Sequence, residues 1–315
     1  MPSLPSRNTT LLVMALGLAP FPVSAGYPEK PISLIEPYPP GSISDIGARV
    51  LARQLSTELG QPVRVVDAPG ANTAVGASKL QQDSADGYAI FWDITSQLAY
   101  VIASKQLPYT ADDFRGIAML GGEAFAVIGR SDDNRFATLA DIISYAKTHP
   151  GELSIADGGD GDSKKALDDL LAAAHIEAKG IPFAGGSTIL TALLGSHVDL
   201  GITAPSNATN NPKLRVVTVL SAAKSYMPMP DVPTAGAAGY AVDAPLLRGL
   251  FVKKGTPSDV VEKLAAASQK ATQSAEWHDF AKRFSQIEAP GGPADANDTL
   301  RKQVARWDDY LKAGH

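Results

Sequence analysis

Short apolar segments of strand length alternate with longer segments of helical periodicity along most of the chain. The first apolar segment, 32–36, is followed by a helical pattern from about 43 to 59, and further apolar segments begin at 63 and 88. A helix between two strands is the connection that parallel strands need, and such helices cover both faces of the sheet. The pattern therefore predicts an α/β protein with parallel sheets.

The first predicted helix has clear start and stop signals. Ser42 and Asp45 have the spacing of a capping box, and Gly60 follows the last apolar position. Its expected apolar face consists of Ile46, Val50, Leu55 and Leu59. The spacing predicts a helix that begins at Ile43 and packs along one face on the sheet.

The same alternation continues to the C-terminus. Strands are expected at 116–120, 125–128, 153–156, 198–202, 214–220 and 248–253, and helices at 138–149, 163–174, 188–194, 256–274 and 295–312. No long linker rich in Pro, Gly or Ser divides the sequence. A boundary between two units would therefore fall within strands or short turns, as in a hinged protein with two lobes.

The N-terminal segment has the composition of a secretory signal peptide. Arg7 precedes the apolar run 11–19, two prolines follow, and Val23-Ser24-Ala25 offers small residues for cleavage. The apolar run is shorter than the roughly 20 residues that a membrane-spanning helix needs. Residues 1–25 are therefore predicted to be removed, which leaves an exported soluble chain that begins near Gly26.

Charge and composition exclude several classes of function. With 28 basic and 33 acidic residues the net charge is −5, so no basic surplus favours nucleic acid. The chain has no cysteine, which excludes disulfides, thiolate chemistry and cysteine zinc sites. The segment 180–187 resembles a phosphate-binding loop, but Gly186 stands where that loop needs lysine. Neither a hydrolase motif nor a metal-binding histidine pair occurs, and we predict no catalytic residue, metal or cofactor.

Five loops that follow predicted strands are candidates for ligand binding. They are 39–45, 67–73, 93–96, 157–163 and 183–188. In open α/β sheets ligands bind beyond the carboxyl ends of the strands, and helix N-termini favour anions there. A small carboxylate could thus be held without Arg or Lys. Each loop taken alone could equally be a turn that only reverses the chain.

Several sequence motifs, taken together, match those of one known protein family. The chain resembles the solute-binding proteins of tripartite tricarboxylate transporters, also called the Bug family, over nearly all of the predicted mature chain. The matching motifs are YPPGSISDIGAR (38–49), VDAPGANTAVGA (66–77), DGY (86–88), PFAGG (182–186), LLGSHVD (193–199), PDVPT (230–234), GLF (249–251) and GTP (255–257).

The resemblance implies a type II periplasmic-binding-protein fold, in which two α/β lobes enclose a cleft. Lobe 1 would contain 26–121 and 222–315, and lobe 2 would contain 122–221. The implied ligand-binding residues are Tyr38, Gly41, Ser42, Ser44 and Asp45 in the first loop, Gly70, Ala71 and Thr73 in the second, Thr95 and Ser96 in the third, and Asp160, Asp162, Phe183, Ala184 and Gly185 in lobe 2.

The sequence departs from the family pattern at the aspartate-rich loop 157–163. Its aspartates could face solvent and cap the next helix, bind a cation, or meet a cationic group of a zwitterionic ligand. Arg248, where the family often has an aromatic residue nearby, could pair with a carboxylate or lie on the surface. The implied ligand class, organic acids, remains, but the particular acid does not transfer.

The function implied by the resemblance is that of a periplasmic solute-binding protein without enzymatic activity. It would capture a small organic acid as a monomer, close on it, and deliver it to the membrane subunits of a tripartite transporter. Two alternatives are a periplasmic sensor that signals to a membrane protein and an exported enzyme on the same scaffold. Neither cofactor nor nucleic acid is expected.

Overall fold

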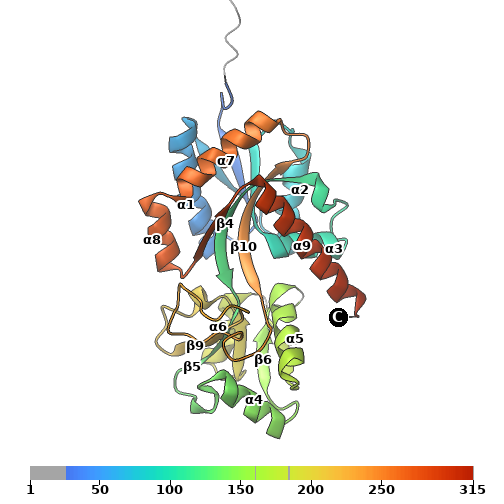
Figure 1. The fold of residues 1–315 in the computed structure, drawn as a ribbon, viewed down its shortest axis with the longest axis vertical. Coiled ribbons are helices and arrows are strands. Elements are labelled where there is room, and N and C mark those ends of the chain that lie inside the picture. The colour runs from blue at the N-terminus through green and yellow to red at the C-terminus, as the bar shows by residue number, and fades with distance from the viewer. Residues whose placement is uncertain (1–25, 160, 184, 315) are drawn as a thin grey trace, which may run out of the picture.

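The structure is a computed structural model that describes residues 26–159, 161–183 and 185–314 (Figure 1). Residues 1–25, where the signal peptide is predicted, lie outside the described residues, as do Asp160 and Ala184. Within the described ranges, no helix combines the length and the apolar character that a membrane crossing requires.

The first of two sheets contains six strands in the order β11-β4-β10-β3-β1-β2. Strand β1 pairs in parallel with β2 and β3, as the sequence predicts. The strands are β1 (Ile32–Glu36), β2 (Val63–Asp67), β3 (Ala89–Ile94), β4 (Phe114–Ala124), β10 (Pro245–Lys253) and β11 (Ile287–Gly291).

Helices cover both faces of this sheet. One face packs on α1 (Ile43–Leu59), α7 (Ser258–Thr272) and α8 (Ala275–Arg283), around Leu51, Trp92 and Leu264. The other face packs on α2 (Ala74–Gln82), α3 (Thr95–Ala103) and α9 (Pro293–Lys312), around Phe91 and Leu98. This body, with its six helices, is called the first lobe below.

The second sheet contains five strands in the order β7-β6-β8-β5-β9 and forms the second lobe. Helices α4 and α5 pack on one face and α6 on the other. The strands are β5 (Ala126–Arg130), β6 (Ser154–Asp157), β7 (Lys179–Pro182), β8 (Leu200–Thr203) and β9 (Leu214–Val219), and the helices are α4 (Leu139–Thr148), α5 (Asp162–Ala174) and α6 (Gly186–Leu194). Short 3₁₀ turns lie at η1 (Ala71–Thr73), η2 (Ala111–Asp113), η3 (Asn134–Phe136) and η4 (Pro205–Asn207).

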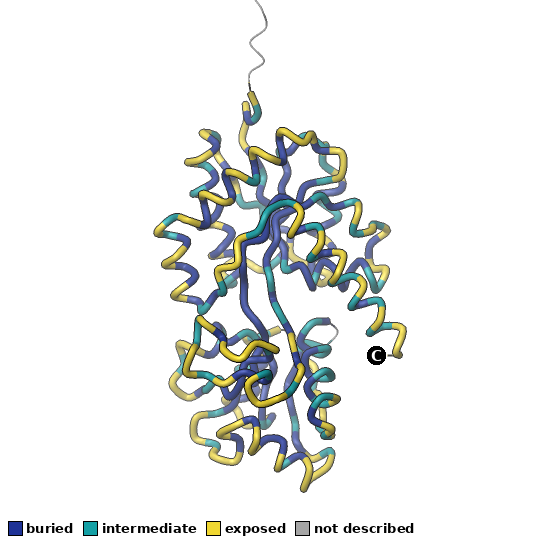
Figure 2. The backbone as a smooth tube through the Cα atoms, viewed as in Figure 1, coloured by how far each residue is buried: buried dark blue, intermediate teal, exposed yellow. Residues whose placement is uncertain are grey.

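The prediction of parallel sheets is correct only in part, because each sheet is mixed. Strand β10 runs antiparallel to both β3 and β4, and β5 runs antiparallel to β8 and β9. The cause is that the chain passes from the first sheet to the second along β4 and β5 and later returns along β10. Figure 1 shows β4 and β10 side by side between the two bodies. Strand β4 is buried there, whereas buried and half-buried residues alternate in the first part of β10 (Figure 2).

The returning segment 220–244 packs on the second lobe through its apolar side chains. Leu220, Ala235 and Val242 belong to the same buried cluster as Phe136 and Ile142. The expected lobe boundaries at 121/122 and 221/222 remain a prediction, since the structure describes a single arrangement of the lobes.

Candidate ligand-binding site

Four of the predicted loops lie at the ends of parallel strands, on the side where the two lobes meet. The loops after β1, β2 and β3 leave the same edge of the first sheet and lead into α1, α2 and α3. The loop after β6 leads into α5 of the second lobe, and Ser96 Oγ at the start of α3 donates to Asp162 Oδ2 at 2.7 Å. Helix N-termini from opposite lobes are therefore in direct contact.

In the first loop, the predicted polar residues largely serve helix α1. Ser42 is the N-cap and accepts from the Asp45 amide at 3.1 Å, while Asp45 Oδ2 accepts from the Gly41 amide at 2.8 Å. Asp45 also pairs with Arg49 at 2.8 Å. Ser44 Oγ accepts from the indole N–H of Trp92 at 2.7 Å. These contacts fix the loop, and they already use the backbone amide of exposed Gly41.

The second loop has a strained backbone. Ala71, Asn72 and Thr73 have φ of 46°, 49° and 75°, and Gly70 before them has φ of 133°. Left-handed conformations of non-glycine residues cost of order 1–2 kcal/mol each and concentrate at functional sites. Gly70 and Ala71 are exposed, whereas Thr73 is buried and its Oγ1 has no hydrogen-bond partner.

Two carboxylates that the sequence analysis did not select lie behind these loops. Tyr38 donates its hydroxyl to Asp93 Oδ1 at 2.8 Å, and the Ile94 amide donates to the same oxygen at 2.7 Å. No hydrogen bond of ordinary geometry reaches Asp93 Oδ2, but a weaker one from the Thr73 hydroxyl lowers the pKa of Asp93. Burial dominates, and it raises the pKa of Asp93 to about 8.

Glu36, at the end of β1, is likewise fully buried. Neither carboxylate oxygen has a hydrogen-bond partner of good geometry. Burial raises the pKa of Glu36 to about 8, against the opposing effects of Ser44 and Arg248. In the sequence, the only sign of this buried acid is that Glu36 ends an apolar strand. A charged residue in that position usually marks a turn.

Arg248 is buried and not on the surface. Its Nη2 lies 3.6 Å from Glu123 Oε1, and Gln286 accepts from its Nη1. Its Nε has no hydrogen-bond partner. The Glu123 carboxylate in turn accepts from the Ser206 amide at 3.3 Å, across to η4 of the second lobe. The guanidinium is thus committed to a carboxylate of the chain itself.

The third loop and the aspartate-rich loop meet each other. Thr95 Oγ1 donates to the Leu247 carbonyl at 3.1 Å, so of the two predicted residues only Ser96 reaches the second lobe. Burial raises the pKa of Asp162 to about 6, against Ser96, Arg306 and Lys165. Among the described residues no group of three or more acidic or histidine side chains could hold a metal ion.

The remaining predicted residues of the second lobe lie at the start of α6. The Phe183 amide donates to the Asp157 carbonyl at 2.8 Å, and the Gly185 amide donates to the Phe183 carbonyl at 2.9 Å. Gly185 is exposed and Phe183 half-buried. No side-chain hydrogen bond ties either residue to the first lobe in the described ranges. Asp160 and Ala184, predicted beside them, lie outside those ranges.

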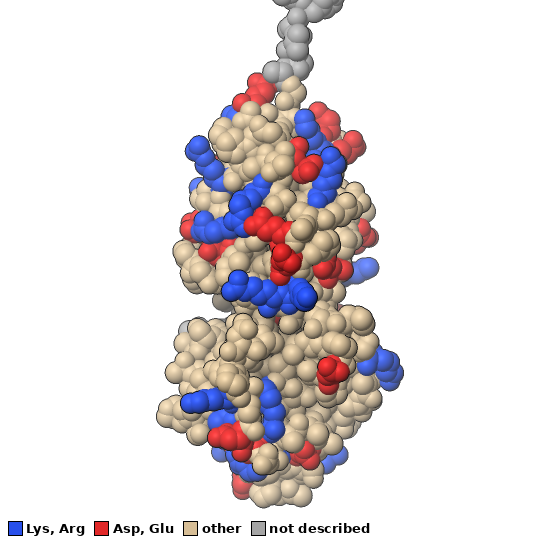
Figure 3. Space-filling view, turned by 90° about the vertical axis from the view of Figure 1, so that its left-hand side faces the viewer, with Lys and Arg blue, Asp and Glu red and all other residues tan. Residues whose placement is uncertain are grey.

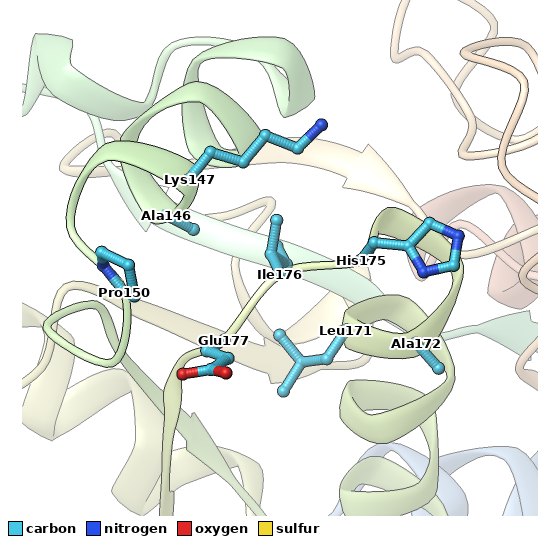
Figure 4. A pocket seen from close by; sticks show the side chains of 8 residues that line it. All are labelled: Ala146, Lys147, Pro150, Leu171, Ala172, His175, Ile176 and Glu177. Atoms are coloured by element: carbon cyan, nitrogen blue, oxygen red, sulfur yellow. The ribbon is translucent and has the colours of Figure 1, made fainter.

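Two pockets help to locate the site. A water-sized pocket of about 10 Å³ lies between the lobes, lined by Ser96, Asp162 and Trp307 among others. A larger pocket of about 460 Å³ lies at the C-terminal ends of α4 and α5 (Figure 4), and no predicted site residue lines it. In Figure 4 its polar side chains lie apart, with Lys147 above Ile176, Glu177 below it and His175 to its right. The larger pocket therefore lacks the converging polar groups of a specific site.

In Figure 3 basic and acidic side chains are interspersed over both bodies, apart from a short basic band where the molecule narrows between them. No extended basic face of the kind that binds nucleic acid is present on the side shown.

Two α/β lobes joined by crossing strands, with helix N-termini that converge from both, define a binding protein of the periplasmic type II class. The family described as tripartite tricarboxylate transporter family receptor, TctC, matches residues 47–313. The chain belongs to this family, which is one of receptors and not of enzymes, as the sequence analysis expected.

Individual relatives agree with this membership. The chain is 31% identical over 274 residues to Protein BugT of Bordetella pertussis, covering 84% of this chain and 83% of BugT. A TctC solute-binding protein from Polaromonas, solved without ligand, has 26% identity and a TM-score of 0.76, covering 91% of this chain and all of that one. The fold alone is shared with MatC of Rhodopseudomonas palustris, solved with bound malate, which has 24% identity and a TM-score of 0.74, covering 90% of this chain and 99% of MatC.

Proposed function

We propose that this chain is the periplasmic solute receptor of a tripartite tricarboxylate transporter, and that it binds a small organic acid between its lobes. The observation that carries the proposal is the contact of Ser96 with Asp162, which joins helix N-termini of opposite lobes. Backbone N–H groups at such termini favour a carboxylate. The relative with bound malate supports the same ligand class.

Delivery would follow from a shift between open and closed arrangements. A ligand that contacts both lobes stabilises the closed arrangement by its differential affinity for it. The closed form would then dock on the membrane subunits of the transporter. The segment 1–25 would direct export, and the mature chain would act as a monomer.

A thermal-shift screen tests ligand binding directly. The purified chain is heated with mono-, di- and tricarboxylates, aromatic acids and amino acids, with and without Ca²⁺. A ligand of the folded state must raise the melting temperature, by an amount that grows with its concentration. We expect at least one carboxylate to do so. Stabilisation by Ca²⁺ alone, or by none of these compounds, would contradict the proposal.

Thr73→Val tests the strained second loop. The change keeps the shape of the side chain and removes the hydroxyl, which has no hydrogen bond of ordinary geometry within the chain. If this hydroxyl donates to the ligand, the affinity for a carboxylate hit should fall by about 0.5–1.5 kcal/mol, roughly two- to twelvefold in Kd. Calorimetric titration measures the change, and Thr57→Val on the exposed surface of α1 is the matched control. Equal Kd values for both variants would remove Thr73 from the site.

A further inference from the structure

The two strands that cross between the lobes carry a buried ion pair. Glu123 lies near the end of β4 and Arg248 lies in β10, and their side chains are 2% and 6% exposed. Arg248 Nη2 lies 3.6 Å from Glu123 Oε1. Burial removes both charges from water, so such a pair adds little to net stability. A role in fixing one arrangement of the chain explains the pair better than a role in stability.

Each end of this pair is held by a different lobe. Gln286 of the first lobe, between α8 and β11, accepts from Arg248 Nη1, and its own amide donates to the Phe284 carbonyl at 2.6 Å. At the other end, Glu123 Oε2 accepts from the backbone amide of Ser206 in η4 at 3.3 Å. A continuous line of buried polar contacts therefore runs from the first lobe, through both crossing strands, to the second lobe.

The backbone beside the ion pair has the features of a hinge. Gly121 lies opposite Arg248 in the pairing of β4 with β10, and its φ of 95° is one that ordinary side chains rarely adopt. The register of the two strands shifts between Arg248 and Gly249, as at a β-bulge. Hinges consist of a few residues that absorb a change in backbone angles, and bulges bend a strand locally. The ion pair therefore lies beside the segment about which the lobes would rotate.

A tyrosine links the two lobes at the same corner of the molecule. Tyr226 lies in the segment 220–244, which packs on the second lobe, and is itself buried there. Its hydroxyl donates to the Ser285 carbonyl of the first lobe at 3.1 Å. The turn that contains Ser285 and Gln286 is therefore connected to the second lobe twice, directly by Tyr226 and indirectly through the buried ion pair.

We propose that Glu123 and Arg248 form a hinge clamp, which holds the two lobes at a defined angle. The inference rests on the proposed function only in the assumption that the lobes move. Rotation of the second lobe would carry Ser206 away from the first lobe and pull on Glu123. The attraction between two charges in the low-dielectric interior would restrain that rotation, because separation leaves each charge buried without a partner. Both are positioning residues, which set the population of each arrangement without touching the ligand.

The distance between two spin labels tests this inference without any ligand. The chain has no cysteine, so Arg64→Cys and Lys179→Cys introduce the only two labelling sites. Both residues are exposed, and they lie in β2 and β7, the edge strands farthest from the crossing strands in the two sheets. Rotation about the hinge therefore changes the distance between the labels. With the ion pair intact, we expect one narrow distribution of distances.

Loss of the clamp should broaden this distribution. Glu123→Gln and Arg248→Met each remove one charge, and the double variant removes both. The double variant leaves no charge buried without a partner, so it remains informative if a single variant fails to fold. The matched control is Asp133→Asn, because Asp133 pairs with Arg130 at 2.9 Å inside the second lobe, and it should leave the distribution narrow. Thermal melting checks that each variant folds.

The outcomes separate the hinge clamp from the proposed function. If the folded double variant keeps the narrow distribution, or if Asp133→Asn broadens it equally, the hinge clamp is overturned. Neither result bears on ligand binding, which the thermal-shift screen with carboxylates tests. If the double variant broadens the distribution while the unaltered chain binds no carboxylate in that screen, the hinge clamp stands and the proposed function is overturned.

Discussion

Glu36 and Asp93 are the residues at which this fold departs most from ordinary protein chemistry. Acidic side chains are rarely fully buried unless they are paired, and neither of these forms an ion pair with a side chain of the described chain. Burial raises the pKa of each to about 8. The free protein at neutral pH therefore holds protons that the unfolded chain would release.

This burial predicts a pH dependence of stability. Glu36 faces Asp93 and Arg248, and Asp93 faces Tyr38 and Asp162. Because the folded pKa values lie above the unfolded ones, the unfolded state loses protons first as the pH rises. The melting temperature should fall from about pH 5 to pH 8 and level off above that.

Amide variants of Glu36 and Asp93 test whether these two residues cause the pH dependence of stability. Asp93→Asn and Glu36→Gln should each flatten the fall in melting temperature between pH 5 and 8. They should also raise the melting temperature at pH 8, where the buried charges of the unaltered chain are most costly. A slope that is unchanged in both variants would show that other groups carry it.

At the residue scale the sequence predicted the loops but not their electrostatics. Ser42, Asp45 and Gly41 contact one another, as their closeness in the sequence suggests, and their role in ligand binding stays a prediction. Glu36 and Asp93 are 57 positions apart, and only the pairing of β1 with β3 brings them together. No local pattern reports such a pairing.

Helix α1 shows at the element scale how closely one helix can be fitted to its neighbours. Gly47 lies in its second turn, and a Cβ there would stand 2.7 Å from Phe280 Cζ of α8 and 3.3 Å from Trp92 Cζ2. The absence of a side chain therefore lets α8 approach α1. Alanine would gain helix propensity but would push aromatic rings of the core apart.

Gly47→Ala is accordingly expected to destabilise the protein. Overpacking costs about 1–3 kcal/mol and the propensity gain returns about 0.5–1 kcal/mol, so the net loss should be about 1–2 kcal/mol. Urea unfolding measures it as a lower midpoint at unchanged slope. Ile46→Ala on the same helix is the control, because Ile46 is 36% exposed and should matter little. A midpoint for Gly47→Ala at or above that of the unaltered chain would contradict the packing argument.

Elements with strong local signals were predicted well, and elements fixed by tertiary contacts were not. The bounds of α1 match because Ser42 and Gly60 cap it, although Ile46, expected on its apolar face, is exposed. The apolar stripe runs instead through buried positions such as Leu51 and Leu55. Helix α3 was not predicted, because it is apolar on most sides and its N-cap, Ile94, offers no capping side chain.

Strand β4 was predicted too short for a different reason. Gly121 and Gly122 end its apolar run and resemble a turn, yet the strand continues to Ala124. A Cβ at Gly121 would stand 2.0 Å from the Ile287 carbonyl oxygen, and one at Gly122 2.1 Å from that of Leu246. The glycines allow β11 and β10 to approach closely, which only the assembled sheet reveals.

The C-terminal helix α9 joins the lobes at the scale of the whole molecule. Helix α9 packs on the first lobe through Leu300 and Trp307, and it reaches α5 of the second. Arg306 donates to Asp169 at 2.8 Å and to the Asp243 carbonyl at 2.7 Å, and Tyr310 donates to Asp168 at 2.5 Å. These contacts stabilise the observed arrangement of the lobes without a ligand.

The contacts of Arg306 and Tyr310 with the second lobe are called the α9 bridge here. Their removal should let the two lobes move apart. The double variant Arg306→Ala, Tyr310→Phe is expected to show a larger radius of gyration in small-angle scattering without ligand, and weaker apparent affinity for a ligand that needs the closed form. Arg301→Ala on the same helix is the control, since it removes a pair with Asp112 inside the first lobe. An identical radius for the double variant and the control would show that the bridge does not hold the lobes together.

Trp307 lies where its intrinsic fluorescence should report the separation of the two lobes. Its indole N–H donates to the Ser96 carbonyl at 2.9 Å beside Asp162, whereas Trp92 and Trp277 pack edge to face inside the first lobe. Separation of the lobes would let water reach the indole of Trp307 and shift its fluorescence emission to longer wavelength. Ligand titration should reverse that shift, and Trp307→Phe should remove it. Opening and closing could thus be followed in real time without any attached dye.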